Sequence, residues 1–496
     1  MNLYLLILLP LLTAVAVLLS RNVNQVKWLA LTGSAAQMIL AFVLFAEYRS
    51  EVASGHTGPM YFEENFSLFP AWNINFHLGV DGISIAMIML TSFVVIAGVL
   101  VSWNMEKMTK EYFFLLVLLG FGAYGFFISL DLFILFFFLE IAVIPKYLLI
   151  GIWGSGKKEY SANKLALMLM GGSALVLVGL LGLYFSSGSF DLVHLSKQNI
   201  PAHVQHIIFP LLFVGFGVFT ALFPFHTWVP DGHSSAPTAG SMFLAGISMK
   251  LGGYGCLRVA TYLLPEGARE YSTIIIILSS IAILYGAFAT MMQKDLKYIN
   301  AYSSVSHVGF SLLGIGMLTQ TALNGAVLQM VSHGLMTALF FAVIGMIYDR
   351  THTRMVAEMG GLMKVMPFTV TVFFIVGLCS LGLPGLSGFV AEMTVFVGSW
   401  QNPGIFYRVA TIAAAMSIVV TAVYILRAVG QTAMGELNLS SHGAGNTGLT
   451  DAKWNERLAA IILLIGIFAI GIMPSWLNEL IKPGVEIIMQ KVGGLK

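Results

Sequence analysis

Long apolar runs separated by short polar segments make up almost the entire chain. Each run is close to the ~20 residues that an α-helix needs to cross ~30 Å of hydrocarbon. The runs lie near 2–20, 28–47, 78–102, 112–130, 132–153, 164–186, 206–225, 238–262, 271–291, 300–318, 323–348, 366–399, 406–427 and 456–479. The pattern predicts an all-α polytopic membrane protein with about fourteen transmembrane helices, the twelfth of them too long for one straight crossing.

The polar positions predict the orientation of these helices. Lys and Arg are concentrated in the loops that follow the odd-numbered helices and are fewer in the opposite loops. Since positive residues prefer the cytoplasmic side, both termini are expected outside, on the periplasmic face of a bacterial cytoplasmic membrane. The opening segment lacks a basic region and a small-residue cleavage site, so it is expected to remain as the first helix.

Helix-breaking residues recur at two places in the pattern. The seventh span ends in LFPFHTWVPDGHSSAPTAG and the twelfth contains LGLPGLSGFVAEM. Paired interruptions of this kind are typical of inverted-repeat transporters. We therefore predict two inverted five-helix repeats, spans 4–8 and 9–13, with helices 7 and 12 broken. The expected divisions of the single membrane domain are 1–111, 112–262 (first repeat), 271–427 (second repeat) and 456–496 (last helix and tail).

The composition agrees with a membrane protein and excludes other classes. Hydrophobic residues make up 58% and charged residues 10% of the chain, against ~25% charged in an average soluble domain. A net charge of +2 without a basic stripe argues against a nucleic-acid partner. Cys256 and Cys379 lie in apolar runs, far from any C-x-x-C motif, and are expected to be small core residues.

Two ionisable residues fall near the middle of predicted spans. Glu140 lies in span 5 and Lys250 in span 8, where a charge costs roughly 2.5–3.5 kcal/mol on insertion scales. Glu140 could be a neutral, hydrogen-bonded structural acid, and Lys250 could extend its stem to an interface. We favour a function for both, since intramembrane acids and lysines commonly mark proton paths.

Further candidates follow in the second half. Glu392 comes just after the break in span 12, where free backbone groups admit water, and His307 and His333 lie within spans 10 and 11. A histidine can relay protons, although a lone histidine on an apolar helix is as often structural. Arg258, near the end of span 8, is expected to be an interfacial anchor.

These groups together favour proton transfer over other chemistry. The sequence has acids, lysines and histidines but no nucleophile–base pair, nucleotide motif or metal-ligand spacing. Two unit charges ~6 Å apart at an effective dielectric of ~20 interact by roughly 3 kcal/mol. Moving one proton can therefore load or empty the next site of a relay.

Five segments resemble the antiporter-like subunits of respiratory complex I. They are FHLGVDGIS (76–84), FFFLEIAVIPKYLLIGIWG (136–154), LFPFHTWVPDGHSSAPTAGS (222–241), DLKYINAYSSVSHVGF (295–310) and HTRMVAEMGGL (352–362). Within that family the chain most resembles chain M of the bacterial enzyme, the equivalent of mitochondrial chain 4.

The resemblance implies a proton-translocating subunit in the membrane arm of NADH–quinone oxidoreductase. Its partners would be neighbouring antiporter-like chains, the lateral helix of chain L and the lipid bilayer. This chain would hold no cofactor, because flavin, iron–sulfur clusters and quinone would belong to partner subunits. The family's functional residues of spans 5, 8 and 12 fall on Glu140, Lys250 and Glu392, and its span-11 histidine region on His333.

One position departs from the family pattern. The lysine usual in span 7, five residues before the proline of the PFH motif, is Phe219 here. Lys146, six residues after Glu140, is a candidate replacement. Six residues of ideal helix leave the two side chains ~120° apart and ~9 Å along the axis. Pro145 can kink the segment and turn the ammonium toward span 7. The alternative is that Lys146 reaches the nearby cytoplasmic interface.

Three functional readings remain open from the sequence. The first is a proton-pump subunit driven by redox chemistry in partner chains. The second is a subunit of a cation/proton antiporter or a membrane-bound hydrogenase, which share this module. The third is a structural arm subunit whose proton path was lost with the span-7 lysine.

Overall fold

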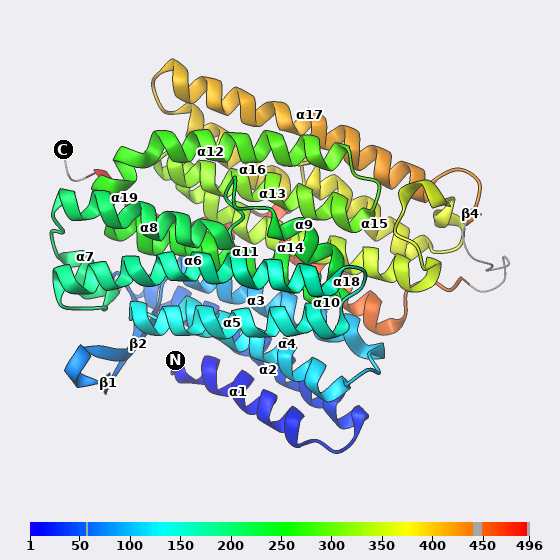
Figure 1. Ribbon diagram of the computed structural model, residues 1–496, viewed down its shortest axis with the longest axis horizontal. Coiled ribbons are helices and arrows are strands. Elements are labelled where there is room, and N and C mark those ends of the chain that lie inside the picture. Colours follow the sequence, from blue (N-terminus) through cyan, green and yellow to red (C-terminus); the bar gives the residue numbers. More distant parts are fainter. Residues whose placement is uncertain (56–57, 440–448, 494–496) are drawn as a thin grey trace.

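In the computed structural model, the chain is a bundle of helices that lie side by side along the longest dimension of the molecule (Figure 1). The structure describes residues 1–55, 58–439 and 449–493, so the end of the predicted tail lies outside the described residues. Within those ranges, ten helices are long and apolar enough to cross a membrane, and two further apolar helices are shorter. The predicted all-α membrane class is confirmed.

Helices fill every apolar run of the sequence. Up to residue 255 they are α1 (Tyr4–Leu19), α2 (Val23–Ala53), α3 (Gly82–Val101), α4 (Thr109–Ile128), α5 (Leu132–Trp153), α6 (Lys158–Ser187), α7 (Leu192–Lys197), α8 (Ala202–Phe219), α9 (Trp228–Ser235), α10 (Thr238–Phe243) and α11 (Met249–Gly255). After it they are α12 (Pro265–Met291), α13 (Leu296–Gly316), α14 (Gln320–Thr351), α15 (Pro367–Ser380), α16 (Ser387–Trp400), α17 (Ile405–Ala433), α18 (Trp454–Ile472) and α19 (Ser475–Gly493). The last predicted span, 456–479, ends early because Pro474 separates α18 from α19.

Aspartates begin several of these helices. Asp81, Asp131, Asp191 and Asp295 precede α3, α5, α7 and α13, and each carboxylate accepts a backbone N–H of the first turn. Such caps satisfy amides that the helix itself leaves unpaired. Three of these aspartates also form isolated antiparallel bridges, Asp131 with Asp191 and Asp295 with Met355. The start of α5 is thus joined to the segment after α6, and the start of α13 to the segment after α14.

The centre of the bundle is formed by α3, α4 and α14. The most apolar stretch of α14 is entirely buried, whereas α2, α6 and α17 each bury less than half of theirs. Because α14 is buried inside the protein over that stretch, its polar residues must find partners there.

Two predicted breaks are present as interruptions of the helical path. Span 7 ends at α8, and an irregular segment leads to α9; span 12 is divided into α15 and α16. The path of span 8 contains two π-helical segments, η3 (Leu244–Ser248) and η4 (Cys256–Thr261), one on each side of α11. π-Helical turns are rare and are frequent at functional sites.

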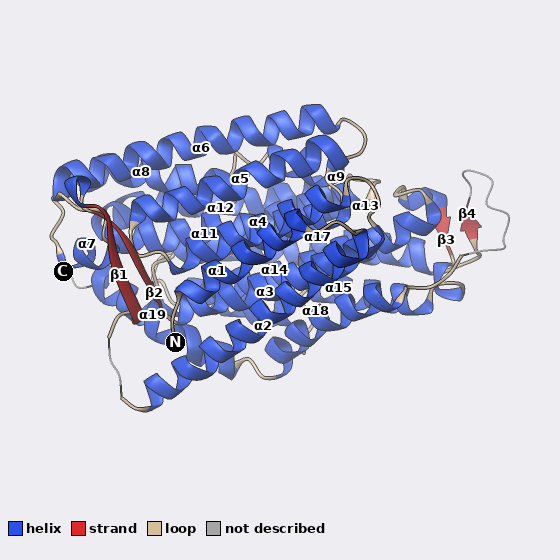
Figure 2. Ribbon diagram, turned by 90° about the horizontal axis from the view of Figure 1, so that it is seen from below, coloured by secondary structure: helices blue, strands red, loops and turns tan. Residues whose placement is uncertain are grey.

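Two small sheets lie at opposite ends of the bundle (Figure 2). Strands β1 (Tyr61–Phe69) and β2 (Ile74–Val80) form an antiparallel hairpin, and β3 (Met359–Gly360) pairs with β4 (Asn438–Leu439). The apolar-run pattern did not predict these strands. We call the two ends of the molecule the hairpin end and the β4 end.

A histidine ties the hairpin to the bundle. His77 of β2 lies against Asp191 through Nδ1, and its Nε2 is 3.2 Å from a carboxylate oxygen of Glu63 in β1. Burial opposes the charged ring, but the hydrogen bond and charge of Asp191 outweigh it and raise the pKa of His77. Burial likewise opposes the Asp191 carboxylate, while its bonds to His77 and to the His194 amide lower its pKa.

The hairpin is therefore expected to be held most firmly at mildly acidic pH. Because the pKa of His77 is raised, its protonation stabilises the folded hairpin. This stabilisation is complete below about pH 6.5, the ordinary histidine value, and is lost as the pH rises through the raised pKa. Because the pKa of Asp191 is lowered, its ionised carboxylate also stabilises the folded hairpin, and this stabilisation is lost only at strongly acidic pH. Hydrogen-exchange protection of the β2 amides, corrected for intrinsic rates, should fall as the pH rises. His77→Gln should remove this dependence, and a wild-type profile that stays flat would contradict it.

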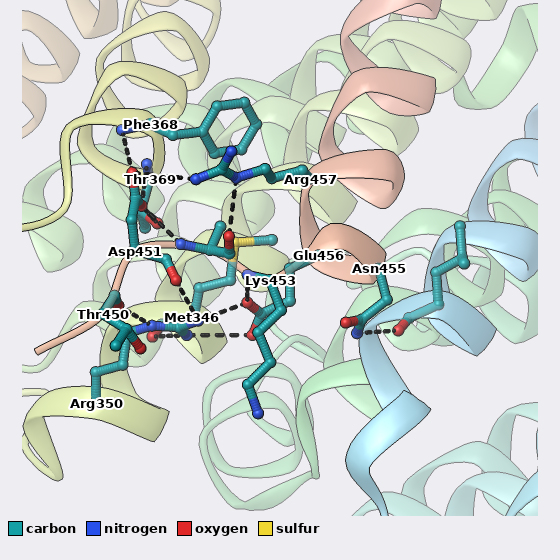
Figure 3. Close-up of polar contacts among 12 residues, drawn as sticks. Met346, Arg350, Phe368, Thr369, Thr450, Asp451, Lys453, Asn455, Glu456 and Arg457 are labelled. Atoms are coloured by element: carbon teal, nitrogen blue, oxygen red, sulfur yellow. Dashed lines mark hydrogen bonds and ion pairs between the residues drawn. The ribbon is translucent and has the colours of Figure 1, made fainter.

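At the β4 end, one arginine joins three helices (Figure 3). Arg350 of α14 donates two hydrogen bonds to the Glu456 carboxylate of α18, at 2.6 and 3.1 Å. It also donates to the carbonyl oxygens of Thr450 and Asp451. The Asp451 carboxylate in turn accepts the first amides of α15, from Phe368 and Thr369.

Arg350→Leu is expected to destabilise the protein strongly. The Arg350 and Glu456 side chains are 8% and 5% exposed, and removing one partner of a buried pair costs about 3–5 kcal/mol because the other charge remains unpaired. The thermal unfolding midpoint in detergent should fall clearly. Lys453→Met, an exposed neighbour, is the matched control and should change little. Equal shifts in the two variants would show that the pair contributes nothing.

Candidate functional site

Four predicted site residues from four different helical segments form one line inside the bundle. The Lys250 Nζ is 2.8 Å from Nδ1 of His333, and the His333 ring centroid is 5.8 Å from that of His307. Nδ1 of His307 is 3.0 Å from the Glu392 carboxylate. All four side chains are at most 4% exposed. The sequence left each histidine as a possible structural residue, but the fold places both between the lysine and the acid.

The backbone around Lys250 explains how the lysine is held. The ammonium also donates to the carbonyl oxygen of Ala245, which lies in the π-helical segment η3. The wider i→i+5 pattern changes which carbonyls the helix itself uses. Lys250 therefore has two acceptors at mid-bundle and no path to an interface, so the snorkelling alternative is wrong.

The far end of the line lies at the break in span 12. Glu392 belongs to α16, one turn into the helix that begins after the interruption, and Nε2 of His307 is 3.0 Å from the hydroxyl of Ser380 at the end of α15. The amide of Gln329 donates to the carbonyl oxygen of His307. His307 thus has a fixed partner on each ring nitrogen.

Glu140 and Lys146 form a second, separate group on α5. Glu140 is half-buried and accepts a hydrogen bond from Ser173 of α6. No hydrogen bond links this group to Lys250 among the described residues.

Lys146 points inward. Its side chain is 1% exposed, and its Nζ has no hydrogen-bond partner among the described residues. The ammonium lies 5.7 Å from the ring centroid of Phe219, the last residue of α8. Lys146 therefore does not reach the interface. Its nitrogen faces Phe219, the position where the resemblance predicts a lysine. The helix α5 continues through Pro145.

Arg258 is buried, where the sequence predicted an interfacial position. It is 2% exposed and forms an ion pair with Asp81, and its guanidinium also lies over the rings of Tyr254 and Tyr262. The prediction of an interfacial anchor was wrong, because Asp81, the N-cap of α3, supplies a buried counter-charge that position within a span does not reveal. Cys256 and Cys379 are free and buried, as predicted.

Three further polar residues, His233, Lys297 and Asp349, were not predicted as site residues. His233 of α9 is fully buried, with both ring nitrogens unpartnered among the described residues, and it stacks on Phe341. Lys297 is 5% exposed and donates to the carbonyl oxygen of Ala236, three residues after His233. Lys297 and Asp349 line a polar cavity of about 740 Å³ at the β4 end. The helix-breaking segment around His233 is the sequence feature that could have identified this histidine as a site residue.

Comparisons with known proteins identify relatives along the whole chain. The family described as NADH:quinone oxidoreductase/Mrp antiporter, TM, matches residues 129–418, which include all six predicted site residues. NAD(P)H-quinone oxidoreductase chain 4-2 of Synechocystis sp. is 36% identical over 502 residues, covering 95% of this chain and 89% of that protein. NADH-quinone oxidoreductase subunit M of Rickettsia typhi is 35% identical over 501 residues, covering 98% of each.

A solved structure agrees with these relatives. One chain of respiratory complex I from Thermus thermophilus with bound NADH superposes with a TM-score of 0.88 at 25% identity, covering 99% of this chain and 100% of that one.

Proposed function

Because the chain belongs to the NADH:quinone oxidoreductase/Mrp antiporter membrane family, we propose that it is a proton-translocating membrane-arm subunit of an NADH–quinone oxidoreductase. The observation that carries the proposal is the buried line from Lys250 through His333 and His307 to Glu392. Each member can hold or release a proton, and the line runs from the middle of one half of the chain to the break in the other.

Proton transfer along this line follows from the chemistry of its members. The Lys250 ammonium can donate to Nδ1 of His333 within their hydrogen bond, and a histidine that gains a proton on one nitrogen can release one from the other. The centroids of the two histidine rings are 5.8 Å apart, close enough for one bridging water that would replace Ser380 at Nε2 of His307. His307 then shares its proton with Glu392 over 3.0 Å.

The unpredicted polar groups suggest where protons enter. The polar cavity at the β4 end reaches Lys297, and His233 lies between that region and Lys250. We propose that protons pass from this cavity by way of His233 to Lys250.

The first-half group would act as a charge switch. Glu140 is the acid whose field reaches the Lys146 ammonium, and the ammonium faces Phe219. We propose that the positive charge expected on span 7 is supplied from α5 and still serves Glu140. The redox cofactors (flavin, iron–sulfur clusters and quinone) would lie in partner chains.

The finer topology is part of the same proposal. We propose fourteen spans with two inverted repeats, spans 4–8 and 9–13, in a bacterial cytoplasmic membrane with both termini outside. Two observations support the repeats: the breaks in spans 7 and 12, and the equivalent bridges Asp131–Asp191 and Asp295–Met355. In this orientation the hairpin end faces outward and the β4 end faces the cytoplasm.

Partner chains would cover the exposed apolar surfaces. The tip of the hairpin carries Phe66, Phe69 and Trp72, each more than half exposed. Neighbouring antiporter-like chains and the lateral helix of chain L are the proposed partners in the membrane arm.

Affinity purification through a C-terminal tag tests the complex. We expect flavin- and iron–sulfur-bearing chains to copurify and the preparation to oxidise NADH with a quinone acceptor. Copurification with antiporter or hydrogenase chains alone, without NADH oxidation, would establish the second functional reading in place of the first. The pumping role itself is tested by the variants described in the Discussion.

A further inference from the structure

An apolar crevice opens on the flank of the bundle between α2, α3, α14, α18 and α19. Its volume is about 290 Å³. Phe42 and Ile465 at its mouth are 42% and 58% exposed, whereas Leu90, Val331 and Leu335 on its floor are at most 4% exposed. The crevice therefore runs from the surface inward to α14, where Val331 and Leu335 lie two residues before and after His333.

A second apolar groove continues from the first along α18. It has a volume of about 480 Å³ and shares Ile465, Ala469 and Trp476 with the crevice. The Trp476 ring stands edge-on to Phe45, and its indole N–H donates to the carbonyl oxygen of Ala469. Trp476 thus lies at the junction of two adjoining apolar channels.

Within the part of the chain that the structure describes, one cation lines the crevice, and the groove has none. Arg49 of α2 is exposed and lies over the ring of Phe45, 5.9 Å from its centroid. No ion pair among the described residues involves Arg49, and both channels are otherwise lined by apolar side chains and glycine. A lone guanidinium at the mouth of an apolar site matches one phosphate.

We propose that the crevice and groove bind one anionic phospholipid. One acyl chain enters the crevice, the second follows α18 on the other side of Trp476, and the phosphate lies at Arg49. Water is a poor occupant, because apolar cavities of this kind stay dry and take apolar ligands. A lipid with an additional headgroup cation is disfavoured, since Arg49 repels that cation. The acyl chain would cover the face of α14 that carries Val331 and Leu335, which lies opposite the face that carries His333.

The fluorescence of Trp476 reports on this site directly. The intact complex is reconstituted in phosphatidylcholine vesicles with increasing brominated-chain phosphatidylglycerol, and the Trp476 signal is taken as the difference between wild type and Trp476→Phe. We expect quenching at about a fivefold lower mole fraction than with brominated phosphatidylcholine, the preference of one cation near an anionic lipid. Arg49→Gln should remove the preference. Arg21→Gln, two residues before the opposite end of α2, should keep it.

Two further measurements complete the test. Ala469→Phe, at an exposed position shared by both channels, should reduce maximal quenching. Mass spectrometry of lipids retained after detergent washing should show less phosphatidylglycerol in Arg49→Gln than in Arg21→Gln, which avoids any change at Trp476. Equal quenching by both lipids, an unchanged preference in Arg49→Gln, or absence of quenching because a protein covers the groove would each overturn the proposal.

Discussion

Replacing Lys250 by Met is expected to reduce proton translocation coupled to NADH oxidation by about tenfold or more, since positioned proton-transfer groups contribute about 10²–10⁴ in rate. Lys250 is the start of the buried line, and its Nζ is 2.8 Å from His333. Without it, His333 has no proton donor among the described residues on that side. The measurement is proton uptake into vesicles per NADH oxidised, together with turnover.

Lys250→Arg separates proton transfer from charge. An arginine keeps the positive charge but does not release a proton under physiological conditions. We therefore expect Lys250→Arg to assemble and still lose translocation. Lys491→Met, which removes a half-buried lysine of α19 outside the line, is the control and should pump normally. Normal pumping by Lys250→Arg would show that Lys250 acts only through its positive charge and transfers no proton.

Lys146→Met is expected to have the second large effect, again about tenfold on coupled turnover. The ammonium has no hydrogen-bond partner among the described residues and is the positive charge whose field acts on Glu140. At ~9 Å, the axial separation of the two residues in an ideal helix, and an effective dielectric of ~20, such a charge alters the energy of a carboxylate by roughly 2 kcal/mol. Glu140→Gln should cause a similar loss, because it removes the other member of the pair.

The double variant Lys146→Met/Phe219→Lys tests whether the positive charge has moved from α8 to α5. If the charge has moved from α8 to α5, returning it to position 219 should restore a substantial part of the pumping lost in Lys146→Met. Phe219→Met in the same background is the control for volume and should not restore it. Failure of the lysine to rescue, with the complex assembled, would contradict the relocation. Full stoichiometry in both Lys146→Met and Glu140→Gln would end the pumping role of this half.

The spans were predictable because apolar length and helix formation are coupled in a membrane. Span 5, predicted at 132–153, is α5 at the same residues. The broken helices were also visible, since both breaks carry proline and glycine close together, whereas the single Pro145 stays inside α5. The hairpin was not, because its short strands resemble polar connections and depend on His77 contacting Asp191, far along the chain.

The site was predictable as a set of residues but not as a geometry. Glu140 and Lys250 can be identified from the sequence because placing a charged side chain in the bilayer costs free energy and is therefore rare. Whether two histidines meet, or whether Arg258 finds a counter-charge, depends on which helices pack together. Sequence spacing carries little information on that point. His233 was overlooked for the same reason. Its neighbours Phe341, Lys250 and Lys297 lie on other helices, and sequence spacing does not show that they are close.

The histidine that ties the hairpin to the bundle has a consequence for the working pump. In the proposed orientation the hairpin end faces the compartment that receives protons. As that compartment acidifies, a larger fraction of His77 is protonated and holds its contacts with Asp191 and Glu63, because the pKa of His77 is raised. The outer anchor of the subunit should therefore be firmest when the proton gradient is largest, and loosest when the membrane is de-energised and the outside is alkaline.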